Sequence, residues 1–458
     1  MEAKITMSHF DSKERLNECR IERILLEDGK EILDDELKSP IFRYGKTLCD
    51  RLPSFTRQEV KLGDVLGTGA FGVVHEVIRI ELSDELGTSS STYKASDCSQ
   101  IDDSIDADQI DHQDIVGSEE DPGFELLNSS FSSREQVAAM CFRNGESRYA
   151  FKSLILEDAC ESQQARARID LAIEVNYLMA LSHQHIVKIR GVFQTDDPFH
   201  AKYFFLMDRL YGTLHDKILE WRESKRIEKV DFIQKILAMM KSQKINNWKR
   251  EFTKERLFIA HDIASAFSYM HGKNVIHRDI KTQNIGFDVR GNVKVFDFGL
   301  AKSLREDRLS YCDYYNLTVK VGSIPYMAPE VILGKPYNEK CDVFSFGILL
   351  YEIISLKPPY NMSVKKGYLK KVAQGERRPK ITPTWPIMTK DIMALSWATS
   401  PRERPSMKSI CKMIKVDLMQ LDTRESIKSR LEYIANMSRH SSCGHSTFEP
   451  SFMEESRH

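Results

Sequence analysis

The chain has 458 residues, of which 41% are hydrophobic, and its 66 Lys and Arg residues nearly balance its 67 Asp and Glu residues. The resulting net charge of -1 gives no argument for binding to nucleic acid or to a membrane. Nine cysteines without a Cys-x-x-Cys pair indicate reduced thiols, not a disulfide framework or a zinc site. The first residues lack an apolar signal core and no apolar run reaches about 18 residues, so we expect no transmembrane segment and a cytoplasmic protein with nuclear access open.

Residues 1–59 form an N-terminal extension that is polar and mixed in charge. Within this extension, residues 22–37 favour a short helix. The extension contains no motif that indicates a chemical role.

A glycine-rich segment with the spacing Gly-x-Gly-x-x-Gly-x-Val follows the extension. It comprises Leu66, Gly67, Thr68, Gly69, Ala70, Phe71, Gly72, Val73 and Val74. Glycines let backbone amides approach phosphate oxygens without an intervening side chain, although a tight hairpin alone would explain the same pattern. The apolar run that continues to Ile80 is typical of a strand, whereas a dinucleotide-binding turn opens a helix. The segment therefore predicts a hairpin that covers phosphates.

The next segment, residues 83–147, is predicted to be a disordered insertion. Its part from residue 97 to residue 121 holds ten carboxylates and no Lys or Arg. Such a composition buries too little apolar surface to offset the entropy lost on ordering.

Lys152 is a single cation in an alternating apolar strand pattern over residues 149–155. Glu174 lies between Leu171 and Leu178 on the apolar stripe of a helix that we expect to begin near Ser162. An unpaired carboxylate on that stripe would be costly to desolvate, so the sequence predicts that Glu174 pairs with Lys152. Each residue taken singly is equally explained as a surface charge.

A second insertion, residues 221–250, carries nine Lys or Arg residues against three acidic residues. Its apolar residues recur at helical spacing, and they are Phe232, Ile233, Ile236, Leu237, Met239 and Met240. A basic amphipathic helix of this kind binds a regulatory partner, lies on a membrane surface or packs on its own domain. The sequence leaves all three alternatives open.

The segment His277-Arg278-Asp279-Ile280-Lys281-Thr282-Gln283-Asn284 follows a helix-period apolar stripe and precedes Asp297-Phe298-Gly299. The stripe consists of Leu257, Ala260, Ile263, Ala264, Phe267 and Met270. Phosphoryl transfer requires a carboxylate that accepts the proton of the attacking hydroxyl and oxygen ligands that hold Mg²⁺ against the triphosphate. Asp279 is the predicted base, and Asn284 and Asp297 are the predicted metal ligands.

These motifs, in this order, resemble the eukaryotic protein kinase family from about residue 60 to about residue 415. The resemblance implies a bilobal α+β fold with a small β-rich N-lobe and a larger α-helical C-lobe. It also implies one domain over residues 60–415 where length alone suggests about three. Residues 416–458 form a tail that we expect to be poorly ordered.

The resemblance further implies residues that bind ATP. Met207 and Asp208 resemble the gatekeeper and the first hinge residue, and Leu210 is expected near the adenine edge. The other expected nucleotide-binding residues are Ala150, Lys152 and the glycine-rich segment Leu66–Val74. The implied catalytic set is Asp279, Lys281, Asn284, Asp297, Lys152 and Glu174, with ATP and Mg²⁺ as cofactors.

Three further residues resemble structural positions of the family. Glu330, in Ala328-Pro329-Glu330, is expected to pair with Arg404. Asp342 is expected to tie the backbone of the catalytic loop to a central helix. These residues would stabilise the fold without performing chemistry.

Substrate class is indicated by two positions. Lys281, two residues after Asp279, is typical of serine/threonine kinases. Gly322-Ser323-Ile324-Pro325-Tyr326 resembles the serine/threonine pattern Gly-Thr-x-x-Tyr, with a serine hydroxyl in place of threonine. The sequence Tyr326-Met327-Ala328 is similar to that of the tyrosine kinase-like branch of these kinases.

The resemblance therefore implies an ATP-dependent serine/threonine kinase of intracellular signalling that acts on protein substrates. The alternative is a kinase-fold scaffold, which generally lacks one of four functional residues. Lys152, Asp279, Asn284 and Asp297 are all present, which favours the enzyme. Arg278 can receive a phosphate from the activation segment. The candidate acceptors are Ser303, Ser310, Tyr311, Tyr314, Tyr315, Thr318 and Ser323.

Overall fold

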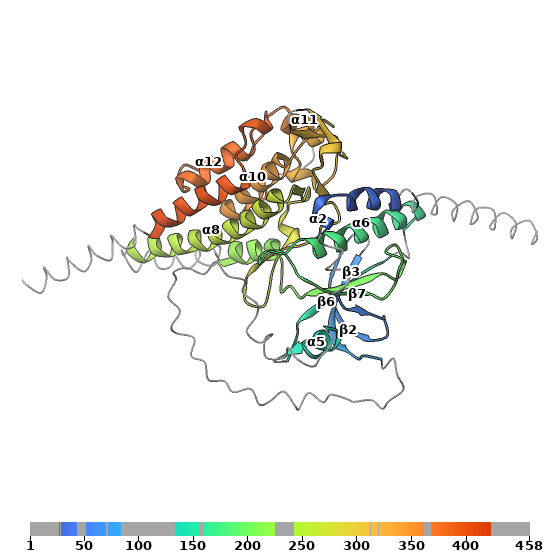
Figure 1. Ribbon diagram of the computed structural model, residues 1–458. Coiled ribbons are helices and arrows are strands. Elements are labelled where there is room, and N and C mark those ends of the chain that lie inside the picture. The colour runs from blue at the N-terminus through green and yellow to red at the C-terminus, as the bar shows by residue number, and fades with distance from the viewer. Residues whose placement is uncertain are drawn as a thin grey trace, which may run out of the picture. The chain divides into compact units, whose positions relative to one another are not determined.

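The computed structural model describes residues 27, 29–43, 52–69, 72–83, 133–143, 145–155, 159–224, 242–311, 313–318, 320–360 and 368–422 (Figure 1). The chain divides into two compact units. The first comprises Met1–Gly212 and Gly286–Ser303, and the second comprises Thr213–Ile285 and Leu304–His458. The first unit contains the large β-sheet and the second is mainly helical, so the predicted α+β class is confirmed.

A six-stranded sheet in the order β1-β7-β8-β6-β3-β2 forms the centre of the first unit. Its strands are β1 (Ser54–Phe55), β2 (Val60–Thr68), β3 (Gly72–Ile80), β6 (Tyr149–Leu154), β7 (Ile189–Phe193) and β8 (Phe204–Asp208). Tyr149 and Phe151 of β6 point into a core with Phe55 and Phe204, and alternation places Lys152 on the other face. Lys152 is opposite Val74 of β3 and Phe205 of β8, so the lysine lies on an inner strand.

Helix α6 (Glu161–Ala180) begins one residue before the predicted start. Leu171, Glu174 and Leu178 are buried along it, as the apolar stripe predicts. Helical residues 29–37 and the short α2 (Pro40–Arg43) lie beside α6 (Figure 1). The helix predicted over residues 22–37 is therefore confirmed for its described part. The folded unit begins before residue 60, because this segment and β1 belong to it.

The predicted disorder of residues 83–147 is wrong for residues 133–143 and 145–147. They form α5 (Ser133–Ala139), β4 (Phe142–Arg143) and β5 (Glu146–Ser147). Val137 and Met140 pack on the sheet core, and Arg134 forms an ion pair of 2.5 Å with the buried Glu59. These apolar and ionic contacts offset the entropy lost on ordering residues 133–143 and 145–147, whereas the acidic stretch has too few apolar residues to do so. Residues 84–132, which include that stretch, lie outside the described residues.

The second unit is built on α8 (Ser242–Gly272) and α10 (Lys340–Ser355). The predicted stripe of α8 from Leu257 to Met270 is fully buried. The other helices are α9 (Pro329–Ile332), α11 (Tyr368–Ala373) and α12 (Ile387–Ser396). The remaining elements of the second unit are β9 (Val275–Ile276), η1 (Thr282–Asn284), η2 (Glu306–Arg308), β13 (Leu309–Tyr311), β14 (Tyr314–Tyr315), η3 (Ile324–Tyr326) and η4 (Pro401–Glu403). The segment Gly286–Ser303 of the first unit contains β11 (Val293–Val295) and β12 (Lys302–Ser303), and β10 (Ile285–Phe287) begins one residue before that segment.

The boundary of the second insertion requires a correction. Residues 242–250 are the beginning of α8, because the helix that leads into the catalytic loop starts further upstream than its apolar stripe indicates. Residues 225–241, with the helical-spacing apolar set from Phe232 to Met240, lie outside the described residues. None of the helices in the described part of the chain has the length and hydropathy needed to cross a bilayer.

The predicted tail boundary at residue 416 is also too early, because residues 407–422 form a helix. Asp417 on this helix is 1% exposed and caps the start of α12. Its carboxylate accepts hydrogen bonds from Thr389 N and Oγ1, each 2.6 Å long, and from Met388 N at 3.1 Å. Burial of Asp417 and Leu418 therefore attaches the first part of the predicted tail to the fold.

Replacing Asp417 by Ala should destabilise the second unit by about 1–3 kcal/mol, because the buried hydroxyl of Thr389 and two N–H groups lose their acceptor. A lowered midpoint in thermal unfolding would show this. The matched control is Asp422→Ala, since that side chain is 58% exposed and its ion pair with Lys254 contributes less than about 1 kcal/mol. Equal midpoint shifts in the two variants would contradict the capping role.

Candidate active site

Lys152 and Glu174 form the predicted ion pair in the first unit. Lys152 Nζ lies 2.7 Å from Glu174 Oε1 and 2.6 Å from Oε2, and 3.5 Å from Oδ1 of Asp297. Strand β6 supplies the lysine, α6 supplies Glu174, and Asp297 follows β11 with φ of 66°. The ammonium of Lys152 therefore forms ion pairs with both carboxylates and connects three chain segments.

The electrostatics of this cluster are governed by burial. Burial raises the pKa of Glu174 to about 7, although the ammonium of Lys152 opposes the rise. For Lys152 burial disfavours the charge, but the carboxylates of Glu174 and Asp297 outweigh it and raise the lysine pKa. Lys152 is consequently a stable cation, and Glu174 is a carboxylate that takes up a proton close to neutral pH.

Asp279 is the centre of a second cluster, which lies in the second unit. Its Oδ1 accepts hydrogen bonds of 2.8 Å from both N and Oγ of Ser323. Its Oδ2 accepts from Lys281 Nζ at 2.5 Å and from Asn284 Nδ2 at 3.0 Å. The structure thus brings together the predicted base, the predicted lysine and one predicted metal ligand, and Ser323 supplies the hydroxyl expected from the Gly-Ser pattern.

Glycine is required at position 322 by close packing. Gly322 has φ of 93°, and a Cβ there would collide with the carbonyl oxygen of Arg278. This close approach brings the backbone of Ser323 against Asp279. The two loops therefore meet only because residue 322 has no side chain.

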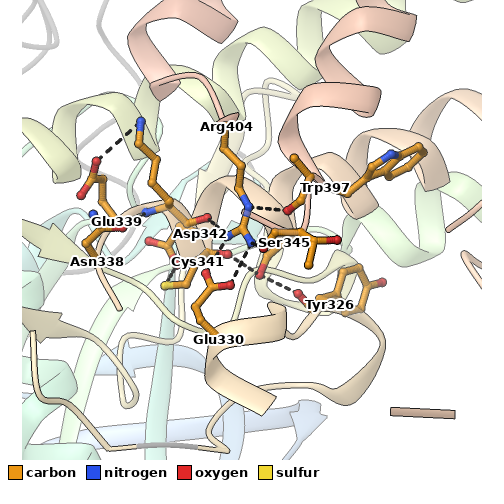
Figure 2. Close-up of polar contacts among 12 residues, drawn as sticks. Tyr326, Glu330, Asn338, Glu339, Cys341, Asp342, Ser345, Trp397 and Arg404 are labelled. Atoms are coloured by element: carbon orange, nitrogen blue, oxygen red, sulfur yellow. Dashed lines mark hydrogen bonds and ion pairs between the residues drawn. The ribbon is translucent and has the colours of Figure 1, made fainter. Parts of the chain in front are cut away.

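Asp342 of α10, labelled in Figure 2, binds the backbone of the catalytic loop, as predicted. The buried carboxylate accepts 2.9 Å hydrogen bonds from the backbone N–H groups of His277 and Arg278, and lies 3.0 Å from His271 Nε2. Burial acts to raise the pKa of Asp342, but these contacts hold it below its ordinary value. Arg278 adopts a left-handed φ of 68° here, and the hydrogen bond from its N–H to Asp342 stabilises this conformation.

The predicted pair of Glu330 and Arg404 is also confirmed (Figure 2). Arg404 Nη1 and Nη2 donate to the two carboxylate oxygens at 2.6 and 2.8 Å. Tyr326 donates a 2.6 Å hydrogen bond to Glu352 of α10, a contact that the sequence did not indicate. Burial and the carboxylate of Glu352 raise the pKa of the Tyr326 phenol. Both pairs attach the segment after Ser323 to the helical unit.

The candidate phosphate acceptors differ in their surroundings. Thr318 is exposed, and its Oγ1 accepts a 2.9 Å hydrogen bond from Arg278 Nη1. Ser303 and Tyr314 are buried, and Ser323 is engaged with Asp279. Thr318 therefore combines accessibility with the cation that the sequence analysis proposed as a phosphate receptor.

The residues predicted to bind the nucleotide are placed as follows. Ala150 and Met207 are buried and face each other in the register of β6 and β8. The carboxylate of Asp208 is held by Arg190 through bonds of 2.7 and 3.1 Å, and its backbone N–H donates a 3.0 Å hydrogen bond to Lys188 O. The predicted hinge role of Asp208 is therefore not one for its carboxylate. Leu210 lies against Gly286.

The glycine-rich hairpin has the openness that a phosphate-binding backbone needs. Gly69 N donates a 2.7 Å hydrogen bond to Gly72 O and closes the turn. A Cβ at Gly67 would meet no atom within 4 Å, and one at Gly69 would meet only Gly72 O at 3.8 Å. Packing within the protein does not demand these two glycines, which fits a role in approaching a ligand. Ala70 and Phe71 lie outside the described residues.

The family model described as Protein kinase domain matches residues 135–414, more than half of the chain. The chain belongs to the protein kinase family. This kinase is 37% identical over 160 residues to a probable LIM domain-containing serine/threonine-protein kinase of Dictyostelium discoideum, covering 35% of this chain and 23% of the relative. It is 35% identical over 171 residues to dual specificity protein kinase shkB of the same organism, covering 37% and 25%.

Serine/threonine-protein kinase STY17 of Arabidopsis thaliana is 32% identical to this kinase over 201 residues, covering 44% of this chain and 32% of the relative. The chain thus spans less than a third of the length of each of these three curated relatives. Recognition of the family from its motifs is confirmed. The family match begins at residue 135, after the glycine-rich hairpin.

Replacing Asp279 by Asn should lower the turnover of this kinase by about 10²–10⁴-fold, because the amide cannot accept the proton of the attacking hydroxyl. ATP affinity should stay close to that of the wild type, since Asp279 acts on the hydroxyl and not on the nucleotide. Steady-state kinetics and nucleotide titration measure the two quantities. Turnover equal to that of the wild type would exclude Asp279 as the base.

The pKa of about 7 for Glu174 predicts a pH dependence. As pH falls through 7, Glu174 takes up a proton, the ion pair with Lys152 is lost and turnover should fall. A profile of turnover against pH measures this fall. The variant Glu174→Gln should have low turnover that does not fall further as pH drops through 7. A fall with the same midpoint in that variant would show that another group titrates. The free energy of unfolding depends on pH in the opposite direction. Because the pKa of Glu174 is higher in the folded state, its contribution to stability is greatest at low pH and is lost as pH rises from about 4.5 to about 7.

Proposed function

We propose that the chain is an active protein kinase that transfers the γ-phosphoryl of ATP to serine or threonine hydroxyls of protein substrates in cytoplasmic signalling. The observation that carries the proposal is the environment of Asp279. One carboxylate oxygen is bonded to Ser323 and the other to Lys281 and Asn284, which orients the base. Asp279 accepts the proton of the attacking hydroxyl in this proposal, and the Lys281 ammonium neutralises charge on the transferring phosphoryl group.

The donor set also supports Mg²⁺ as the metal. Asn284 uses Nδ2 for both of its bonds to Asp279, so its Oδ1 oxygen is the atom left for a cation. Asp297, whose side chain is 41% exposed, is the other metal ligand that the sequence predicts. Among the described residues no cluster of three or more His, Cys, Asp or Glu side chains forms a metal site. Few protein oxygens are expected for Mg²⁺, because it keeps waters and binds substrate phosphates. When bound, Mg²⁺ would neutralise charge on the triphosphate.

Lys152 is proposed to orient the phosphates, with Glu174 holding the lysine in place. The bidentate contact of 2.6 and 2.7 Å between them supports an active enzyme over a kinase-fold scaffold. A scaffold has no need to keep a buried carboxylate paired with this lysine, since removing both charges would cost nothing in catalysis. The glycine-rich hairpin, Met207, Asp208 and Leu210 complete the proposed ATP site.

The basic segment 221–250 is the proposed place for a regulatory partner. Its excess of six positive charges favours an acidic partner. The matched part covers only 16% and 32% of two curated relatives, and their names do not describe such a segment. Charge alone supports this part of the proposal.

Incubation with ATP, Mg²⁺ and a generic basic protein should give phosphoserine or phosphothreonine, because Lys281 and Ser323 surround Asp279 in the serine/threonine manner. Phosphoamino-acid analysis identifies the product, and chelation of Mg²⁺ should abolish it. Asp279→Asn is the control for contaminating activity. Predominant phosphotyrosine would contradict the assignment to serine and threonine. Dual specificity is the alternative, because one relative, shkB, is named a dual specificity protein kinase.

A further inference from the structure

Glu36, in the helical residues 29–37 of the N-terminal extension, is a buried carboxylate with four donors. Its side chain is 1% exposed. Oε1 accepts hydrogen bonds from the N–H and the hydroxyl of Ser303, each 2.7 Å long, and from the hydroxyl of Tyr177. Oε2 forms a 2.7 Å ion pair with Lys302 Nζ. Nothing in the sequence motifs assigns a role to this residue.

The donors come from two segments of the proposed active site. Tyr177 is three residues after Glu174 on α6, so the two side chains lie about one helical turn apart. Lys302 and Ser303 follow Asp297 by five and six residues. Glu36 therefore bonds both α6, through Tyr177, and the segment after Asp297, through Ser303.

Apolar contacts press the same N-terminal segment against α6. Phe42 packs edge-on to Tyr177 with ring centroids 5.1 Å apart, and Leu33 is buried. At Gly29 the backbone comes so close to α6 that a Cβ would lie 2.5 Å from the side chain of Ile169. The contact thus extends over two turns of α6, from Ile169 to Tyr177, and Glu36 is its polar centre.

These contacts close a ring within the first unit. Lys152 contacts Glu174 and Asp297, Glu174 shares α6 with Tyr177, and Ser303 shares a short segment with Asp297. Glu36 joins Tyr177 to Ser303 and completes the ring. Without Glu36, the buried donors of Tyr177 and Ser303 would lose this acceptor, and that loss favours separation of the two segments.

We propose that Glu36 is a positioning residue of this kinase, through which the N-terminal segment 29–43 holds α6 and Asp297 in the arrangement that pairs Glu174 with Lys152. The inference rests on the proposed function and extends it to a part of the chain outside the family match. The segment acts on catalysis only through the Lys152 cluster. Loss of Glu36 therefore lowers turnover by loosening that cluster.

The test is a double-mutant cycle on the full chain with Glu36→Ala and Glu174→Gln. Glu36→Ala should lower kcat about tenfold in the wild-type background and less than twofold when Glu174 is already replaced, because the cluster it positions is then broken. The matched control is Glu31→Ala, which removes an exposed carboxylate from the same helix and should leave kcat unchanged. Glu36→Gln keeps the acceptor for Tyr177 and Ser303, loses the ion pair with Lys302, and should fall between wild type and Glu36→Ala.

The same tenfold loss in both backgrounds, or no loss in either, would overturn the inference, since a merely structural residue acts independently of Glu174. Amide hydrogen exchange supplies a second readout that needs no activity. Glu36→Ala should accelerate exchange in α6 around Glu174–Ala180 and in residues 300–303, whereas Glu31→Ala should not. If the wild-type chain transferred no phosphate, the proposed function would fail, and the exchange result alone would then support or overturn the positioning by Glu36.

Discussion

The buried ion pair of Lys152 and Glu174 is the interaction on which the arrangement of the first unit depends. A carboxylate buried in a helix face costs several kcal/mol unless a cation compensates it, so α6 is held where Glu174 reaches β6. Asp297 shares the same lysine and is thereby brought into the cluster. In this unit, β6, α6 and the segment at Asp297 each contain one of these three residues. The glycine-rich hairpin continues into β3, which pairs with β6 beside Lys152.

The second unit likewise contains a buried charged residue, Asp342, that holds separate segments together. Its carboxylate is satisfied by two backbone N–H groups of the catalytic loop and by His271, so the loop conformation and the helix α10 stabilise each other. Asp279 then projects from a loop whose backbone is held by these hydrogen bonds, which favours the preorganisation that catalysis uses. Gly322 adds a steric condition, because only glycine allows the Ser323 segment to approach.

Part of the N-terminal extension belongs to the folded domain. A family match that begins at residue 135 includes neither the glycine-rich hairpin nor the segment 29–43, yet both belong to the first unit. Glu36 makes four contacts there that involve Tyr177, Lys302 and Ser303. Its carboxylate resembles Glu174 and Asp342 in being buried and bound by donors from other segments, so each of these three buried acids joins segments of its own unit.

The sequence by itself determined the family, the strand that carries Lys152 and the helix that carries Glu174, and the family resemblance in turn implied the pairs of Glu330 with Arg404 and of Asp342 with the loop. Motif spacing and apolar periodicity are local properties, so they could be found without coordinates. Only the tertiary structure revealed that residues 133–143, the helix through Asp417 and the carboxylate of Glu36 belong to the fold. Those assignments depend on which distant surface covers each side chain, and a polar segment gives no local sign of such burial.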